Sequence, residues 1–113
     1  QLDRLAERSG SFLNRLERLL KGQLDRGDVT LASLAAELNM SPRTLQNRLE
    51  ASGMSFRSVV DRVRQSEAES YLRESRLPLI DIALALGFAN QTSFQHAFKR
   101  WTGKSPGEFR RQS

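Results

Sequence analysis

The feature that most limits how this 113-residue chain can fold is an internal repeat. Residues 34–40 (LAAELNM) match residues 82–88 (IALALGF) at an offset of 48. Because the second copy then has one extra residue, Ser41 corresponds to Asn90. Two apolar pairs follow in the same register, Leu45 with Phe94 and Leu49 with Phe98. A repeat of this kind indicates one supersecondary unit that is used twice.

The residues of each copy predict a helix-turn-helix. Ala35 and Ala83 are small residues at the point where two helices must approach closely. Four positions later stand Asn39 and Gly87, and these two residue types adopt a positive φ most readily. A small residue, a left-handed turn four residues on and a capped second helix together describe this motif.

Apolar residues recur at helical spacing along the rest of the chain, and no stretch alternates as a strand does. We therefore predict an all-α fold of about seven helices. These helices are expected over residues 11–25, 31–38, 42–51, 56–75, 78–87, 90–102 and 106–109. Thr30 and Ser41 are expected N-caps, and Gly53 is an expected left-handed C-cap.

The domain organisation follows from these helices. Residues 1–10 are expected to be the remnant of a linker from an upstream domain, because Gly10 interrupts their helical pattern. The chain also begins at Gln1 rather than Met, which suggests a piece of a longer protein. Residues 11–113 are expected to form one domain. Its parts are a first helix-turn-helix at about 31–52, a long central helix at about 56–75 and a second helix-turn-helix at about 79–102.

The second helix of the second copy has two chemically different faces. Its apolar residues recur at helical spacing and are expected to point inward: Phe94, Ala97, Phe98 and Trp101. The other face carries Gln91, Thr92, Gln95 and His96, with Lys99 and Arg100 close behind. Amides and hydroxyls hydrogen-bond base edges and cations hold phosphates, so this face suits a DNA major groove.

The corresponding helix of the first copy carries Arg43, Gln46 and Asn47 at positions i, i+3 and i+4. Arg pairs with O6 and N7 of guanine, while Gln and Asn pair with N6 and N7 of adenine. The plainer alternative is an ordinary solvated helix face. The repeat and the capped N-terminus favour base contact, because the second helix of such a motif enters the major groove.

Positive charge gathers at the end of the second unit, where Glu108 is the main acid nearby. The cations there are Lys99, Arg100, Lys104, Arg110 and Arg111. Phosphate contact is favoured over simple solubilising charge at these positions. A net charge of +5 for the whole chain also favours a polyanionic partner.

The long central helix adds a geometric argument. About 20 residues of α-helix are roughly 30 Å long. Major-groove faces on one side of B-DNA recur at roughly 34 Å. A helix over residues 56–75 is therefore about long enough to hold two recognition helices in adjacent major grooves.

Composition excludes several other kinds of site. The chain has no cysteine and one histidine, which excludes disulfides and thiolate zinc sites and nearly excludes a histidine-based metal cluster. No cofactor is predicted. The acidic residues form no acid–base constellation, so no enzyme is predicted. No apolar run is long enough to span a membrane and no signal peptide is present, so a reducing cytoplasm is expected.

Together these features resemble the C-terminal DNA-binding domain of the AraC/XylS family of bacterial transcription regulators, over about residues 14–111. The most specific positions are Ile82, Ala83, Gly87, Phe88, Phe94, Phe98, Lys99, Arg100, Gly103, Ser105, Pro106, Phe109 and Arg110. The resemblance implies promoter binding, usually with activation. It also implies that an effector acts only through an upstream domain.

The resemblance further implies roles for individual residues. The base-reading positions are Arg43, Thr44, Gln46, Asn47, Gln91, Thr92, Ser93, Gln95 and His96. The positions near phosphates are Ser41, Asn90, Lys99, Arg100, Lys104 and Arg110. This chain departs from the family at Asn47 and His96, where the family often has Arg.

Two other functions fit the same sequence. A helical bundle with basic faces can dock RNA polymerase or another acidic partner without binding DNA, and an activator can do both. The chain can also be the DNA-binding part of an enzyme such as a recombinase, in which case the catalytic residues lie outside it. Capture of polymerase by a chain that fails to bind duplex DNA would favour the first of these.

Overall fold

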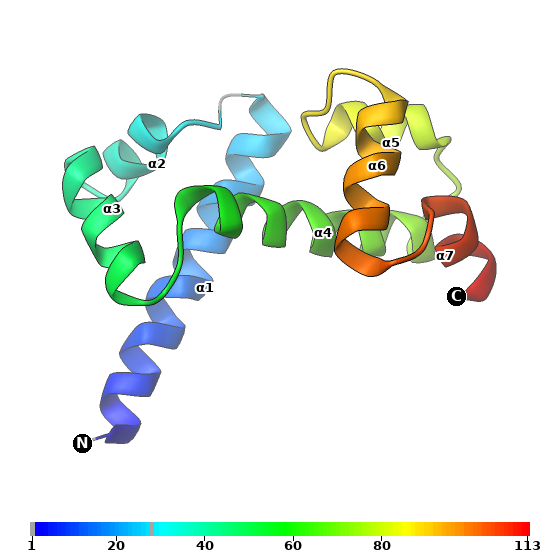
Figure 1. Ribbon diagram of the computed structural model, residues 1–113. Coiled ribbons are helices and arrows are strands. Elements are labelled where there is room, and N and C mark those ends of the chain that lie inside the picture. Colours follow the sequence, from blue (N-terminus) through cyan, green and yellow to red (C-terminus); the bar gives the residue numbers. More distant parts are fainter. Residues whose placement is uncertain (1, 28) are drawn as a thin grey trace. The chain divides into compact units, whose positions relative to one another are not determined.

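The computed structural model describes residues 2–27 and 29–113, with side chains from residue 11 onward. Within those residues the protein has seven α-helices and no strand, which confirms the predicted all-α class (Figure 1). The helices are α1 (Leu2–Arg26), α2 (Leu31–Glu37), α3 (Pro42–Ala51), α4 (Phe56–Glu74), α5 (Leu79–Ala85), α6 (Gln91–Thr102) and α7 (Pro106–Gln112).

The chain divides into two compact units within the long helix α4. Unit 1 ends at Val63 and unit 2 begins at Arg64. Unit 1 therefore holds α1, α2, α3 and the start of α4, and unit 2 holds the rest of α4 with α5, α6 and α7. Each unit contains one copy of the sequence repeat, and each has its own hydrophobic core.

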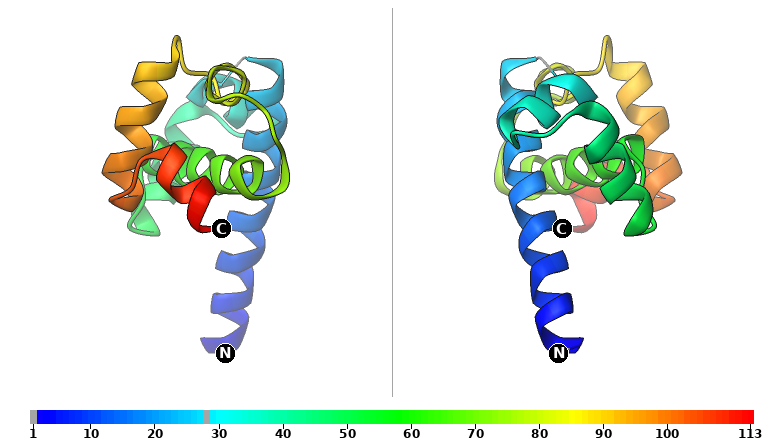
Figure 2. Two further views of the ribbon diagram at one scale, coloured as in Figure 1. Left: turned by 90° about the vertical axis from the view of Figure 1, so that its right-hand side faces the viewer. Right: turned by 90° about the vertical axis from the view of Figure 1, so that its left-hand side faces the viewer.

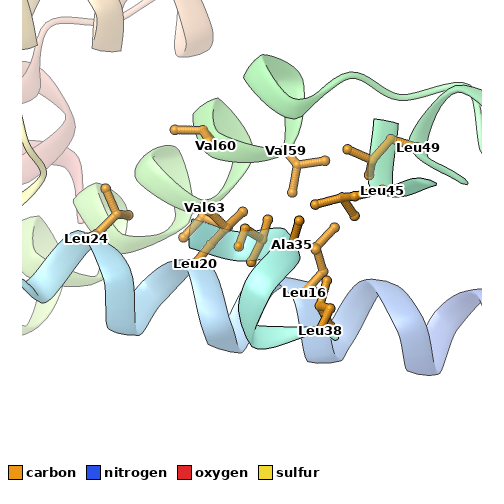
Figure 3. Close-up of a cluster of buried hydrophobic side chains, with 11 residues drawn as sticks. Leu16, Leu20, Leu24, Ala35, Leu38, Leu45, Leu49, Val59, Val60 and Val63 are labelled. Carbon is orange, nitrogen blue, oxygen red and sulfur yellow. The ribbon is translucent and has the colours of Figure 1, made fainter. Parts of the chain in front are cut away.

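The core of unit 1 is aliphatic. Its buried side chains come from the four helices and from the residue that follows α2: Leu16, Leu20, Leu24, Leu34, Ala35, Leu38, Leu45, Leu49, Val59, Val60 and Val63. Figure 3 shows this cluster. Phe12 and Phe56 pack against the edge of this cluster and stay partly exposed. The helical spacing of these residues in the sequence is thus the spacing of one buried face on each helix.

The predicted break at Gly10 is wrong. α1 runs unbroken from Leu2 to Arg26, so the segment assigned to a linker is the first part of this helix. A glycine lowers helix stability by about 1 kcal/mol relative to alanine, but without a left-handed φ it does not end a helix. The side chains of residues 2–10 lie outside the described part of the structure.

The core of unit 2 is aromatic. Phe94 and Phe98 of α6 are fully buried with Ile82, Ala83 and Leu86 of the preceding helix and turn. The Phe94 and Phe98 ring centroids lie 5.9 Å apart at 61°, an edge-on packing that aromatic rings prefer. The view along α5 in Figure 2 shows α6 running across it at a steep angle, as in a helix-turn-helix.

The turns of the two units are built by the same hydrogen bonds. Met40 N–H donates to the Ala35 carbonyl at 2.9 Å, and Asn39 N–H donates to the Ala36 carbonyl at 3.1 Å. In the second unit, Phe88 N–H donates to the Ala83 carbonyl at 3.0 Å, and Gly87 N–H donates to the Leu84 carbonyl at 3.1 Å. This pair of bonds is the Schellman motif, which needs a left-handed residue after the helix.

The left-handed residues are those that the sequence predicted. Asn39 has φ 56° and is the one non-glycine residue with positive φ in the described part of the chain. Gly87 has φ 85° at the corresponding place. Gly53, which follows α3, has φ 74°, so the predicted left-handed turn there is also confirmed. The repeat in the sequence is thus a repeat of backbone conformation.

Two glycines are expected to respond to alanine substitution with opposite signs. Gly53→Ala should lower the free energy of unfolding by about 1 kcal/mol, because an added Cβ meets no atom but the left-handed φ of 74° is strained. Gly22→Ala should raise it by about 0.5–1 kcal/mol, because Gly22 lies within α1 and its Cβ would make ordinary contact, 3.5 Å from Arg26 Nη1. Urea titration followed by circular dichroism measures both, and shifts of the same sign would contradict this account.

Candidate nucleic-acid interface

Helix α3 shows a polar face above two buried leucines. Ser41 Oγ accepts from Thr44 N–H at 3.1 Å, which confirms the predicted N-cap, and Pro42 occupies the first turn. Leu45 and Leu49 are buried in unit 1. The predicted base-reading residues of this helix are all exposed: Arg43, Thr44, Gln46 and Asn47.

Arg48 lies on a different part of α3. Its guanidinium carbon stands 4.0 Å from the centre of the Phe12 ring, so the side chain covers an aromatic residue of α1. A cation over a ring is attracted by the negative face of the π system. Arg48 thus contributes to packing between α1 and α3.

Helix α6 repeats the same arrangement. Asn90 Oδ1 accepts from Ser93 N–H at 2.8 Å and caps the N-terminus, and Gly103 ends the helix with φ 80°. Phe94, Ala97 and Phe98 are buried, as predicted. Trp101 is half-buried beside Phe88, with ring centroids 6.1 Å apart. Within the described residues its buried indole Nε1 has no hydrogen-bond partner.

The outer face of α6 carries the predicted polar side chains. Thr92, Ser93 and His96 are exposed, while Gln91 and Gln95 are half-buried. Lys99 and Arg100 follow in the last turn, and both are exposed. The helix therefore presents hydrogen-bonding groups first and cations one turn later, on the side away from its aromatic core.

Two of the cations predicted near phosphates have protein partners. Lys104 Nζ donates to Gln112 Oε1 at the surface of α7. Arg110 is half-buried, and its guanidinium donates to four backbone carbonyls of residues 71–77. These bonds hold the guanidinium of Arg110 against the protein. The bonds are made between residues far apart in sequence, so no local pattern could reveal them.

Arg64 is a further residue of the site's scaffold that the sequence reading missed. Its Nε donates to the Leu86 carbonyl at 3.1 Å, and its guanidinium carbon lies 5.0 Å from the centre of the Phe88 ring. Arg64 thus reaches from α4 to the turn that precedes α6. The sequence does contain one indication of this role. Arg64 stands four residues after Val60 and four before Ala68, so helical spacing places it on the buried side of α4.

Among the described side chains, which begin at residue 11, no group of three or more His, Cys, Asp or Glu residues is placed to hold a metal ion. No helix in the described part of the chain is both long enough and apolar enough to cross a membrane.

The chain matches a family model described as a helix-turn-helix domain over residues 34–112. It is 41% identical over 100 residues to the ornithine utilization regulator of Pseudomonas aeruginosa. The matched region covers 88% of this chain and 29% of that protein. The chain thus spans less than a third of the length of this relative.

Solved structures give the same result. The C-terminal domain of AraT, a response regulator from Geobacillus stearothermophilus, superposes with a TM-score of 0.76 at 31% identity, covering 89% of this chain and 84% of that one. A Chromobacterium violaceum regulator described as an AraC-type DNA-binding domain-containing protein shares the fold with a TM-score of 0.80, at 20% identity and over 92% and 93% of the two chains. Since the family model covers most of the chain and the relatives are transcriptional regulators, this protein belongs to the AraC/XylS family as a DNA-binding domain.

Proposed function

We propose that this domain binds double-stranded DNA sequence-specifically, with α3 and α6 as its two recognition helices. The observation that carries the proposal is the repeated turn. In each unit a Schellman motif is followed by a side-chain N-cap and by a helix that is buried on one side and polar on the other. The second helix of such a motif lies in the major groove with its first residues against the bases.

The proposed base-reading residues are the polar side chains on the first turns and outer faces of these helices. They are Arg43, Thr44, Gln46 and Asn47 in α3, and Gln91, Thr92, Ser93, Gln95 and His96 in α6. The forked guanidinium of Arg43 suits O6 and N7 of guanine. The amides of Gln46 and Asn47 suit N6 and N7 of adenine.

The proposed phosphate contacts are Ser41, Asn90, Lys99, Arg100 and Lys104. The side-chain oxygens of Ser41 and Asn90 already cap their helices, so their backbone N–H groups are the donors to phosphate. Lys99 and Arg100 supply positive charge one turn further along α6. If Lys99, Arg100 and Lys104 each contact a phosphate, raising the salt concentration from about 50 to 200 mM should weaken binding about 40-fold.

The length of α4 supports binding to adjacent major grooves. Its 19 residues make about 28 Å of helix, close to the roughly 34 Å between major-groove faces. We further propose that the domain serves a cytoplasmic activator whose effector-binding part lies elsewhere in a longer protein. No catalytic role is proposed.

A second candidate function is contact with RNA polymerase. Three large apolar side chains around α5 are exposed to solvent: Leu77 at 39%, Ile80 at 39% and Leu84 at 56%. Exposed apolar groups of this size favour contact with another protein. A chain that captured polymerase but bound no duplex would support this function in place of DNA binding.

Selection of bound duplexes from a random pool tests the proposed function. We expect the selected sequences to share two groups of fixed bases, about one helical turn apart, which we call the α3 half-site and the α6 half-site. Footprinting on a selected duplex should protect both. Equal binding of selected and scrambled duplexes at physiological salt would overturn the sequence-specific proposal.

Two exposed cations are expected to differ in their effect on binding. Arg43→Ala should reduce discrimination at one base pair of the α3 half-site about tenfold, because a lost bidentate contact removes a base preference. Lys99→Ala should weaken all sequences alike and reduce the salt slope by about 1, because a phosphate contact carries no base information. Binding to matched and mismatched duplexes at several salt concentrations separates the two. Loss of discrimination in Lys99→Ala with an unchanged slope would contradict the assignment.

A further inference from the structure

We infer that Arg110 is a positioning residue for the second recognition helix: it anchors α7 to the end of α4, and α7 in turn supports the buried face of α6. The inference deepens the proposed function and rests on it for the DNA measurements. It replaces the phosphate contact that the sequence predicted for this residue.

The anchor is a set of four hydrogen bonds from one guanidinium. Arg110 Nε donates to the Leu72 carbonyl at 3.3 Å, and Nη1 donates to the Leu77 carbonyl at 2.8 Å. Nη2 donates to the carbonyls of Tyr71 at 3.5 Å and Ser75 at 3.3 Å. Tyr71 and Leu72 lie in the last turn of α4, and Ser75 and Leu77 follow it. The C-terminus of a helix carries partial negative charge, so a cation is well placed there.

The neighbouring residue carries the effect to α6. Phe109 of α7 packs edge-on against Phe98, with ring centroids 5.3 Å apart at 77°. Phe98 is fully buried and lies on the inner side of α6, opposite the exposed His96. Phe109 is also in contact with α4, because the guanidinium carbon of Arg73 lies 5.0 Å from the centre of the Phe109 ring. Displacement of α7 therefore removes a support of α6.

The geometry distinguishes this role from phosphate binding. A guanidinium has five N–H donors in a fixed fork, and this fork already meets four carbonyls. Lysine keeps the charge but cannot reproduce the fork. A phosphate contact tolerates lysine, whereas the anchor does not. The next residue, Arg111, is exposed on the same helix and serves as the matched control.

The test compares Arg110→Ala, Arg110→Lys and Arg111→Ala in three measurements. The first is discrimination between a selected duplex and duplexes mutated in either half-site, and the second is the salt slope. The third is the fluorescence of Trp101, the one tryptophan of the chain, which lies in α6 next to Phe88. It reports on the packing of α6 without DNA.

Both Arg110 variants are expected to reduce discrimination at the α6 half-site about tenfold, which is the scale of one base preference. Discrimination at the α3 half-site and the salt slope should stay unchanged. The Trp101 emission should shift to longer wavelength in both. Arg111→Ala should change neither the discrimination nor the emission.

Several outcomes would overturn the inference. One is a salt slope lower by about 1 in Arg110→Ala, with discrimination preserved and Arg110→Lys behaving as wild type, since this describes a phosphate contact. Phe109→Leu keeps the four hydrogen bonds and removes the ring contact with Phe98, so unaltered discrimination in this milder variant would also overturn it. If the wild-type domain bound no duplex, the proposed function would fail, and unchanged Trp101 emission in Arg110→Ala would still decide against the anchor.

Discussion

Phe98→Ala is expected to lower the free energy of unfolding by about 3–5 kcal/mol, the range found when a buried phenylalanine is truncated. Phe98 is fully buried, and the centre of its ring lies 5.9 Å from that of Phe94 and 5.3 Å from that of Phe109. The substitution removes both aromatic contacts and leaves a cavity at the centre of unit 2. Urea unfolding monitored by circular dichroism measures the effect.

The site of the damage can be followed separately. Trp101 lies in the same helix as Phe98, so its fluorescence reports unit 2, whereas circular dichroism reports all the helices. Arg100→Ala is the matched control, because Arg100 is exposed on the same helix and should change stability by less than about 0.5 kcal/mol. A decrease below about 1 kcal/mol for Phe98→Ala would show that this ring is not central to the unit.

Inserting about five base pairs between the α3 and α6 half-sites is expected to weaken binding about 100-fold, because two linked sites bind far more tightly than one. The insertion turns the second half-site by about half a helical turn, to the opposite side of the duplex. The proposal of adjacent grooves treats α4, a continuous helix of 19 residues, as a connection that does not follow that rotation as a flexible linker would. Titration of labelled duplexes by fluorescence anisotropy gives the two affinities.

The control duplex changes the bases between the half-sites without changing their number. It should bind as tightly as the selected duplex, because under the proposal α3 and α6 contact no base between the half-sites. Near-equal affinity for the lengthened duplex would mean that one helix-turn-helix supplies almost all of the binding free energy. The proposal of two adjacent grooves would then fail, while sequence-specific binding by a single unit would stand.

The predictions from sequence that the structure confirmed are those that depend on local chemistry. Asn39 and Gly87 adopt the left-handed turn because their residue types tolerate positive φ, and the Schellman hydrogen bonds span only six residues. Ser41 and Asn90 cap their helices because a side-chain oxygen three residues before an N–H reaches it. The buried faces of α3 and α6 follow from helical spacing alone.

The predictions that failed or stayed open concern long side chains and weak local signals. The sequence suggested a break at Gly10, yet α1 continues through it. It offered no means to place Arg48 over Phe12, or Arg64 on the Leu86 carbonyl. An arginine side chain is long and flexible, so its partner depends on which carbonyl or ring the fold brings near.

The chain's own residues dictate two copies of a capped helix, a left-handed turn and a second helix with a polar outer face. Caps, turns and periodic burial are interactions between residues a few positions apart, so they are present in the linear pattern. The contacts of the cationic side chains are not present in that pattern. Arg100 and Arg110 are the same residue type ten positions apart, yet one is exposed on α6 and the other holds four carbonyls of residues 71–77. Folding alone creates that difference, because it brings the last helix against the C-terminal end of α4.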